Sequence, residues 1–87
     1  MEEEKQKVGV VFNYFAKPEV AAINITDGVL EIGDTIHIKG ETTDFTQKIE
    51  SMQIEREPVK KAEKGQSVGI KVKERVRPND VVYKVMD

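Results

Sequence analysis

The stretch "GVLEIGDT", Gly28 to Thr35, comes within one residue of a phosphate-binding loop of the form G-x-x-x-x-G-K-[ST]. Asp34 stands where that loop needs its lysine, and a carboxylate there would repel the β- and γ-phosphates of a nucleotide. We therefore expect no nucleotide here. We interpret the same residues as a β-hairpin.

His37 is the second group that could do chemistry, because it could form a Ser-His-Asp arrangement with Ser51 or Ser67. It lies between Ile36 and Ile38 in an alternating segment, and no feature of the sequence selects a partner for it. We therefore expect a histidine on the outward, solvent-facing side of a strand, and no catalytic residue.

Other routes to catalysis are also weak. The chain has no cysteine and one histidine, which excludes a thiolate site, a Cys nucleophile and a polyhistidine metal site. The acidic groups at residues 2–4 and at Glu55 and Glu57 lack the apolar neighbours that raise a carboxyl pKa for acid catalysis. The sequence predicts a protein that is not an enzyme, with no metal and no cofactor.

Charge is distributed unevenly along the chain, although the net charge is only −2. Residues 1–44 carry four basic and nine acidic groups (net −5), and residues 45–87 carry ten basic and seven acidic groups (net +3). If the cations of the second half share one face of the domain, a polyanion could bind there. The alternative is that these charges are scattered over the surface and only keep the protein soluble. The cations in question are Lys48, Lys71, Lys73, Arg75 and Arg77.

The elements that would position these groups have a period of two, which predicts strands. Residues 8–15 and 20–26 alternate in this way, and Asp27-Gly28 is a favoured two-residue hairpin turn that should fold the chain straight back into residues 29–32. Ile36 and Ile38 should point inward in the next strand. Two more strands are expected at residues 67–73 and 81–85, while residues 58–65 are mostly loop with Val59 and Ala62 turned inward.

The segment "ETTDFTQKIESMQIE", residues 41–55, fits either a helix or a strand. Phe45, Ile49 and Met52 have helical spacing, yet the neighbouring β-branched threonines and the following Pro58 favour a strand. We expect one long strand over residues 45–56 with a bulge near Glu50-Ser51 that reverses the alternation. The alternative is a short helix that plugs one mouth of a barrel.

Gly33-Asp34 and Asn79-Asp80 form a faint internal echo, since both pairs stand just before a strand. Gly and Asn tolerate left-handed backbone geometry, and an Asp can bond the backbone nearby. Similar turn chemistry explains the echo without a duplication.

These elements predict one all-β domain, a small closed or nearly closed antiparallel barrel of about six to seven strands. It should span residues 8–87, after a disordered acidic tail over residues 1–7. No apolar run is long enough to cross a membrane, and the acidic N-terminus is unlike a signal peptide, so we expect a cytoplasmic protein. Most aromatic side chains should be in the core, except Phe15, which is out of phase with Phe12 and Tyr14.

Three stretches together resemble domain two of the translational GTPases, such as elongation factor Tu and initiation factor two. They are "VAAINITDGVLEIGDTIHIKG", "FTQKIESMQIEREPVKKAEKGQSVGIKV" and "RPNDVV". The similarity covers nearly the whole chain and is closest to small stand-alone elongation-factor-like proteins. A similar barrel is also appended to collagenase-like peptidases. The matching positions are turns and core residues, so the resemblance implies a fold and no catalytic group.

The resemblance implies a non-enzymatic binding module that contacts ribosomal or transfer RNA, or another part of the translation machinery, without GTP. The alternative is a protein-interaction subunit that docks on an enzyme such as a collagenase-like peptidase. The first turn lacks the arginine common in elongation factor Tu, and Lys17 replaces its charge but not its forked geometry. The residues we expect to bind RNA or a partner are Phe15, Lys17, Lys48, Lys71, Lys73, Arg75 and Arg77.

Overall fold

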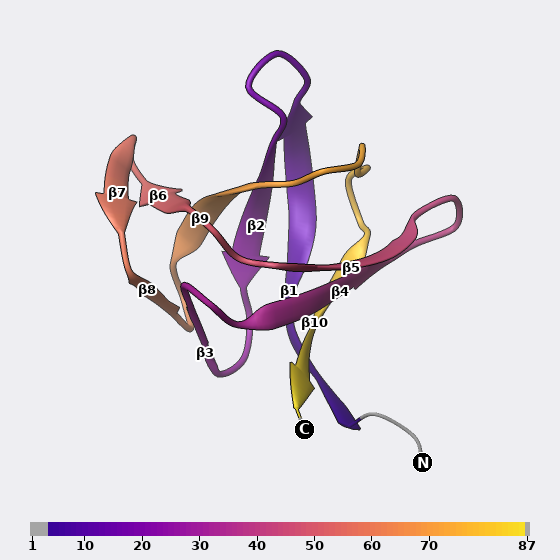
Figure 1. The fold of residues 1–87 in the computed structure, drawn as a ribbon, viewed down its shortest axis with the longest axis horizontal. Coiled ribbons are helices and arrows are strands. Elements are labelled where there is room, and N and C mark those ends of the chain that lie inside the picture. The colour runs from indigo at the N-terminus through magenta and orange to yellow at the C-terminus, as the bar shows by residue number, and fades with distance from the viewer. Residues whose placement is uncertain (1–3, 87) are drawn as a thin grey trace.

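A computed structural model describes residues 4–86, and every regular element in that range is a strand (Figure 1). The expectation of an all-β protein is confirmed. The ten strands are β1 (Glu4–Phe15), β2 (Val20–Ile25), β3 (Val29–Glu31), β4 (Thr35–Lys39), β5 (Asp44–Lys48), β6 (Met52–Ile54), β7 (Glu57–Val59), β8 (Lys61–Glu63), β9 (Ser67–Lys71) and β10 (Val81–Met86).

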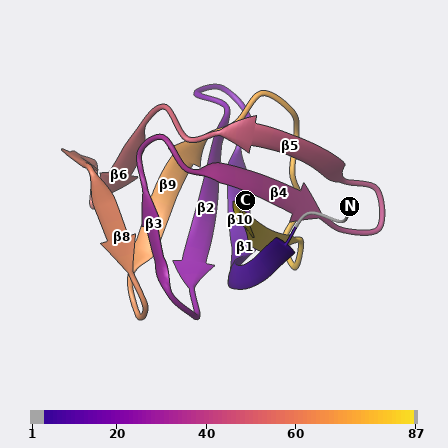
Figure 2. The same ribbon diagram turned by 60° about the horizontal axis from the view of Figure 1, so that its bottom comes forward.

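Eight strands form one antiparallel sheet in the order β5-β4-β10-β1-β2-β9-β6-β7, and β3 pairs with β8 in a second, two-stranded sheet. Figure 2 shows the sheets curving around a common interior. The large sheet keeps two edges, β5 and β7, so the pairing of residues 4–86 does not confirm a closed barrel. The described residues form ten strands and not six or seven, because the expected strand over residues 45–56 is divided into β5 and β6, and because β7 and β8 form where mostly loop was expected.

One apolar core fills this interior and draws side chains from both sheets. Alternation selects them, as in β4, where Ile36 and Ile38 are fully buried as expected. Val59 and Ala62 also face the core as expected, although they lie in strands β7 and β8 and not in a loop. The largest fully buried side chains are Ile23, Leu30, Ile36, Ile38, Ile49, Met52, Ile70, Val8, Val11, Val68, Val76 and Val82.

Strand β1 joins the two halves of the large sheet because it changes partner along its length. Its first half pairs with β10 and its second half with β2, and its register shifts at two places, between Lys7 and Gly9 and between Val11 and Asn13. At Gly9 the neighbouring strand is so close that a Cβ atom would lie 2.5 Å from the carbonyl oxygen of Asn24. The second shift leaves Phe12 as an extra residue, which is a β-bulge.

The N-terminal segment differs from the sequence prediction of a disordered tail over residues 1–7. Residues 4–7 belong to β1 and pair with the end of β10, with Lys5 opposite Val85 and Lys7 opposite Tyr83. The backbone hydrogen bonds of that ladder outweigh the polar composition from which a tail was expected. Residues 1–3 lie outside the described range.

The expected hairpin at Asp27-Gly28 is wrong, because β3 does not pair with β2. Gly28 does have the positive φ (68°) of a turn residue. However, the amides of Thr26 and Asp27 both donate to the carbonyl oxygen of Val8, at 2.8 and 3.2 Å, and this carries the chain away from β2. Strand β3 pairs with β8 instead, more than thirty residues further along the chain.

Residues 44–54 are extended, so the strand prediction is confirmed over the helix. The expected single strand is two strands, because β5 pairs with β4 whereas β6 pairs with β9 and β7. The break lies at the expected place, residues 49–51. Ile49 is fixed there by two backbone hydrogen bonds, to the oxygen of Asp34 (2.8 Å) and from the amide of Gly33 (2.9 Å).

The echo found in the sequence corresponds to a turn that occurs three times. In the turns 31–34, 63–66 and 77–80, the last amide donates to the first carbonyl oxygen at 3.0–3.1 Å, and the third residue has φ between 79° and 97°. The side-chain oxygen of the last residue, Asp34, Gln66 or Asp80, accepts from the first amide at 2.7–2.9 Å. Each is a type II turn, and each leads directly into a strand of the large sheet.

The close approach at Gly9 makes a testable prediction. We expect Gly9→Ala to lower the free energy of unfolding by about 3 kcal/mol, because the new methyl group must displace the backbone of β2. Gly33→Ala is the control: a Cβ there meets nothing within 4 Å, and only the positive φ (97°) carries a cost, about 1 kcal/mol. Urea denaturation of both variants measures the difference, and equal costs would contradict the packing described for β1.

Candidate docking surface

Two aromatic side chains of β1 stand on the outside of the sheet. Phe12 points outward because it follows the buried Val11, and the extra residue at Phe12 shifts the alternation so that Tyr14 faces the core and Phe15 points outward. Phe12 is 47% exposed and Phe15 is 49% exposed, the largest values among the large apolar side chains of the described chain. The expectation that Phe15 is exposed is confirmed, but Phe12 was expected in the core.

These phenylalanines border a groove of about 410 Å³ on the outer face of β1, β2, β9 and β6. Its floor is low because small residues, Ala22 of β2 and Gly69 of β9, face each other across the ladder. A Cβ atom at Gly69 would lie 3.1 Å from Cγ1 of Val20, so the groove owes its depth to that glycine. The lining residues are Phe12, Phe15, Pro18, Val20, Ala22, Gln53, Glu55, Arg56, Ser67, Val68 and Gly69.

A charged turn lies at the β6–β7 side of the groove. Glu55 and Arg56 connect the two strands with φ values of 52° and 68°, the left-handed geometry of a two-residue type I′ turn. Such turns favour Asn and Gly, and other residues cost roughly 1 kcal/mol each in this geometry. The groove therefore combines an apolar aromatic wall with one charged pair held in a strained turn.

The cations predicted to bind a partner do not form one surface. Lys48, Lys71 and Lys73 line a second hollow of about 520 Å³, which Glu19 and Glu50 also line. The side-chain amide of Gln47 spans this hollow, donating to the oxygen of Lys71 (2.9 Å) and accepting from the amide of Lys73 (2.8 Å). The structure thus brings together three of the six predicted cations, with two carboxylates beside them.

The other three predicted cations lie in different surroundings. The Arg75 guanidinium stands over the ring of Tyr14, 5.9 Å from its centre, which is a cation–π contact. Arg77 lines a third hollow together with Lys39 and Asp80. Lys17 is exposed in the turn between β1 and β2, next to Pro18 of the groove.

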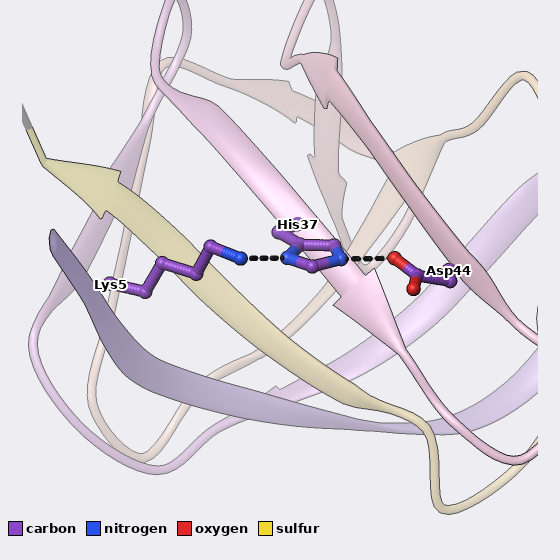
Figure 3. A network of polar contacts seen from close by, with 3 residues as sticks. All are labelled: Lys5, His37 and Asp44. Carbon is purple, nitrogen blue, oxygen red and sulfur yellow. Dashed lines mark hydrogen bonds and ion pairs between the residues drawn. The ribbon is translucent and has the colours of Figure 1, made fainter. Parts of the chain in front are cut away.

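His37 is not the solvent-facing residue that the sequence predicts; it is only 8% exposed. Its two ring nitrogens contact the ammonium of Lys5 (Nδ1, 2.7 Å) and the carboxylate of Asp44 (Nε2, 2.5 Å), as Figure 3 shows. The ring of Tyr83 lies 6.2 Å away, centre to centre. The burial was missed because Lys5 reaches His37 only through the part of β1 that was expected to be a tail.

Neither histidine nitrogen is available to activate a serine, since both have partners. The Ser67 hydroxyl donates to Asn24 at 2.6 Å, and Ser51 lines the hollow near Lys48. Within residues 4–86 no cluster of three or more His, Cys, Asp or Glu side chains could hold a metal ion. The same range contains no helix long and apolar enough to cross a membrane.

The near phosphate-binding loop is not the expected hairpin, because β3 pairs with β8 and with neither β2 nor β4; its residues 31–34 form a turn. The carboxylate of Asp34 accepts from the amide of Glu31 at 2.9 Å and lies 3.3 Å from the ammonium of Lys84. This places the Asp34 side chain inside the turn and not beside a phosphate.

Comparison with known proteins begins with a family model described as Elongation factor Tu domain 2, which matches residues 19–83. Two curated collagenases of Porphyromonas gingivalis are both 45% identical over 82 residues, which is 93% of this chain. An uncharacterised protease of Methanocaldococcus jannaschii is 42% identical over 80 residues, which is 91% of this chain. The chain spans only about a fifth to a quarter of these relatives, 19–23% of their lengths.

The similar solved structures also come from a peptidase and from a translation factor. Two structures of the C-terminal domain of a putative U32 peptidase from Geobacillus thermoleovorans align with a TM-score of 0.83 each. The first is 26% identical, and the alignment covers 88% of this chain and 96% of that domain. The second is 27% identical, and the alignment covers 91% of each. The GDP-bound aIF5B of Aeropyrum pernix aligns with a TM-score of 0.62 over 94% of this chain and 14% of that protein, at 12% identity. The expected resemblance to translation-factor domain two is confirmed, and the relatives favour the peptidase alternative over RNA.

The contact between His37 and Asp44 makes stability depend on pH. The hydrogen bond from His37 holds the pKa of the Asp44 carboxyl below its ordinary value of 3.8; the charges of His37, Lys39 and Lys5 add to this, and desolvation opposes it. Because the pKa of Asp44 is lower in the folded chain, the ionised carboxylate stabilises the fold above pH 3.8. This stabilisation is lost as the pH falls through the lowered pKa.

We therefore expect Asp44→Asn to be less stable than the native chain at pH 7, and the gap to narrow steadily below about pH 4. Urea midpoints measured from pH 7 to pH 2.5 give this profile. Glu41→Gln, at an exposed acid three residues earlier, should change stability by less than about 0.5 kcal/mol. A gap that stays constant down to pH 2.5 would show that Asp44 is not stabilised by this contact.

Proposed function

Because this chain belongs to the Elongation factor Tu domain 2 family, we propose that it is a non-catalytic docking domain that binds the catalytic part of a collagenase-like peptidase. The groove between Phe12, Phe15 and the Glu55-Arg56 turn is the proposed contact surface. The observation that carries this proposal is an exposed aromatic pair on a domain whose relatives include peptidases.

The relatives support the choice of partner. In the curated collagenases the matching segment is about a quarter or less of the chain, so most of each protein lies outside it. The solved counterpart is the C-terminal domain of a putative U32 peptidase. A domain of this kind has the remainder of such a peptidase as its nearest possible partner, either within one chain or between chains.

The groove has the chemistry of a protein interface. Burying a phenylalanine that is now half exposed contributes roughly 1–2 kcal/mol, and aromatic side chains are enriched among the residues that dominate binding energy. Glu55 and Arg56 at the rim could form charged hydrogen bonds that fix the orientation of the partner. Their strained turn fits a site kept for function at some cost in stability.

We propose that the large sheet forms a nearly closed barrel and that this closure gives the groove a rigid support. The Gln47 amide bridges β5 to the last residue of β9 and to Lys73, and so joins two strands that the backbone ladder does not pair with each other. This side-chain bridge supports the view that the open ladder is completed as a nearly closed barrel. Strands fixed in this way hold Phe12 and Phe15 at a constant spacing.

The absence of catalysis is part of the proposal. Both ring nitrogens of His37 are engaged by Lys5 and Asp44, and Glu55, the acidic residue of the groove rim, lies in an exposed turn. RNA binding has less support, because the predicted cations are divided among several sites and two carboxylates share the hollow with three of them.

The groove can be tested with the catalytic part of a U32-type peptidase from the same organism, lacking its own matching segment. We expect the native chain to bind it and the double variant Phe12→Ser, Phe15→Ser to bind about thirtyfold more weakly or worse, by isothermal titration calorimetry. Ile32→Ser is the matched control, since Ile32 is 45% exposed and does not line the groove. Its affinity should stay within about twofold of the native value.

Salt separates the two functional hypotheses in the same experiment. An apolar interface should hardly change between 50 and 500 mM salt, whereas phosphate contacts would weaken by orders of magnitude. The docking proposal fails if the native chain does not bind the peptidase part, or if the double variant binds it equally well. It also fails if the chain binds ribosomal or transfer RNA through Lys48, Lys71 and Lys73 with a steep salt dependence.

A further inference from the structure

Lys5, His37 and Asp44 lie in a row across the outer face of the large sheet, and each comes from a different strand, β1, β4 and β5 (Figure 3). The ammonium of Lys5 is 2.7 Å from Nδ1 of His37, and a carboxylate oxygen of Asp44 is 2.5 Å from Nε2. The row therefore connects the first residues of β1 to strands that β1 does not pair with directly.

These contacts determine which nitrogen of His37 carries the proton. A lysine ammonium has donors only, so Nδ1 must accept and can hold no proton. A carboxylate has acceptors only, so Nε2 must donate. The row is thus satisfied only by a neutral imidazole with its proton on Nε2.

Adding a proton to this ring has opposite effects on its two contacts. An imidazolium has donors at both nitrogens, so Nδ1–H would face the Lys5 ammonium with no lone pair and with a second positive charge. The contact of Nε2 with Asp44 would gain a full opposite charge and become stronger. Protonation therefore expels Lys5 and retains Asp44.

Other charged groups around His37 favour the same outcome for Lys5. Lys7 of β1 lies opposite Tyr83, and Tyr83 lies opposite His37 across β10. Lys39 follows two residues later in β4 and is opposite Asp44. Tyr83 and Thr46 are the direct cross-strand neighbours of His37, so Asp44 is the anionic partner of the ring and Lys5 the cationic one.

The segment that Lys5 belongs to can move without the rest of β1. Residues 4–7 pair only with β10, and the register shift between Lys7 and Gly9 separates them from the part of β1 that is held between β10 and β2. Loss of one side-chain contact in such a terminal ladder opens it locally, while the core remains folded.

We propose that Lys5, His37 and Asp44 form a pH-sensitive latch that holds residues 4–7 on the sheet at neutral pH and releases them when His37 is protonated. The latch determines whether residues 4–7 stay paired with β10. It is independent of the docking function proposed above, and it requires no partner.

The chain has a single histidine, so its ring can be followed without ambiguity in a uniformly ¹⁵N-labelled sample of the full chain. We expect long-range ¹H–¹⁵N spectra at pH 8 to show the proton on Nε2 and an unprotonated Nδ1. On acidification to pH 5, amide exchange at residues 5–7, corrected for the intrinsic rate, should rise about tenfold as the charged hydrogen bond is lost. Exchange at Ile36 and Ile38 should not change.

Three variants complete the test. Lys5→Met should show the fast exchange already at pH 8, and His37→Gln should abolish the pH response. Lys7→Met is the matched control on the same strand and should retain it, since Lys7 is exposed and outside the row. A proton on Nδ1 at pH 8 would overturn the proposal, as would a native response at residues 5–7 that persists unchanged in His37→Gln.

Discussion

The change of partner along β1 is the constraint on which the rest of the structure depends. A single strand pairs first with β10 and then with β2, and it can do so only because its register shifts twice. The absence of a side chain at Gly9 permits the close approach of β2, and the extra residue at Phe12 reverses the faces of everything that follows. Without that reversal Tyr14 would leave the core and Phe15 would enter it.

The same bulge places Phe15 beside Phe12 on the surface to which we assign the function. In a domain this small most apolar area is needed inside, yet two phenylalanines remain outside beside a floor kept low by Ala22 and Gly69. A turn with two positive φ values at Glu55 and Arg56 completes the groove. An exposed aromatic pair and a strained charged turn at one place both cost stability, which is why we assign them to a partner and not to folding.

Local chemistry was predictable from the sequence, and long-range pairing was not. The turns at Gly33-Asp34 and Asn79-Asp80 form as expected because a side chain and a backbone only three residues apart define them. The burial of Ile36 and Ile38 follows from alternation alone. The predicted hairpin at Asp27-Gly28 was wrong because β3 pairs with β8. The predicted exposure of His37 was wrong because its contact Lys5 is thirty-two positions away in the sequence. Of the groove, the sequence predicted the exposure of Phe15; the single cationic face that it predicted is divided among several places in the structure. The position of Phe15 beside the groove depends on the β-bulge at Phe12, and no residue type in that stretch of the sequence predicts a bulge there.

Hydrogen–deuterium exchange of the ¹⁵N-labelled chain, with and without the catalytic part of a U32-type peptidase, tests the central claim most directly because it reports the backbone amides of all residues except proline in one experiment. The account predicts new protection in the residues that line the groove, at 12–22, 53–56 and 67–69. Protection confined to the hollow at Lys48, Lys71 and Lys73, or none anywhere, would contradict it.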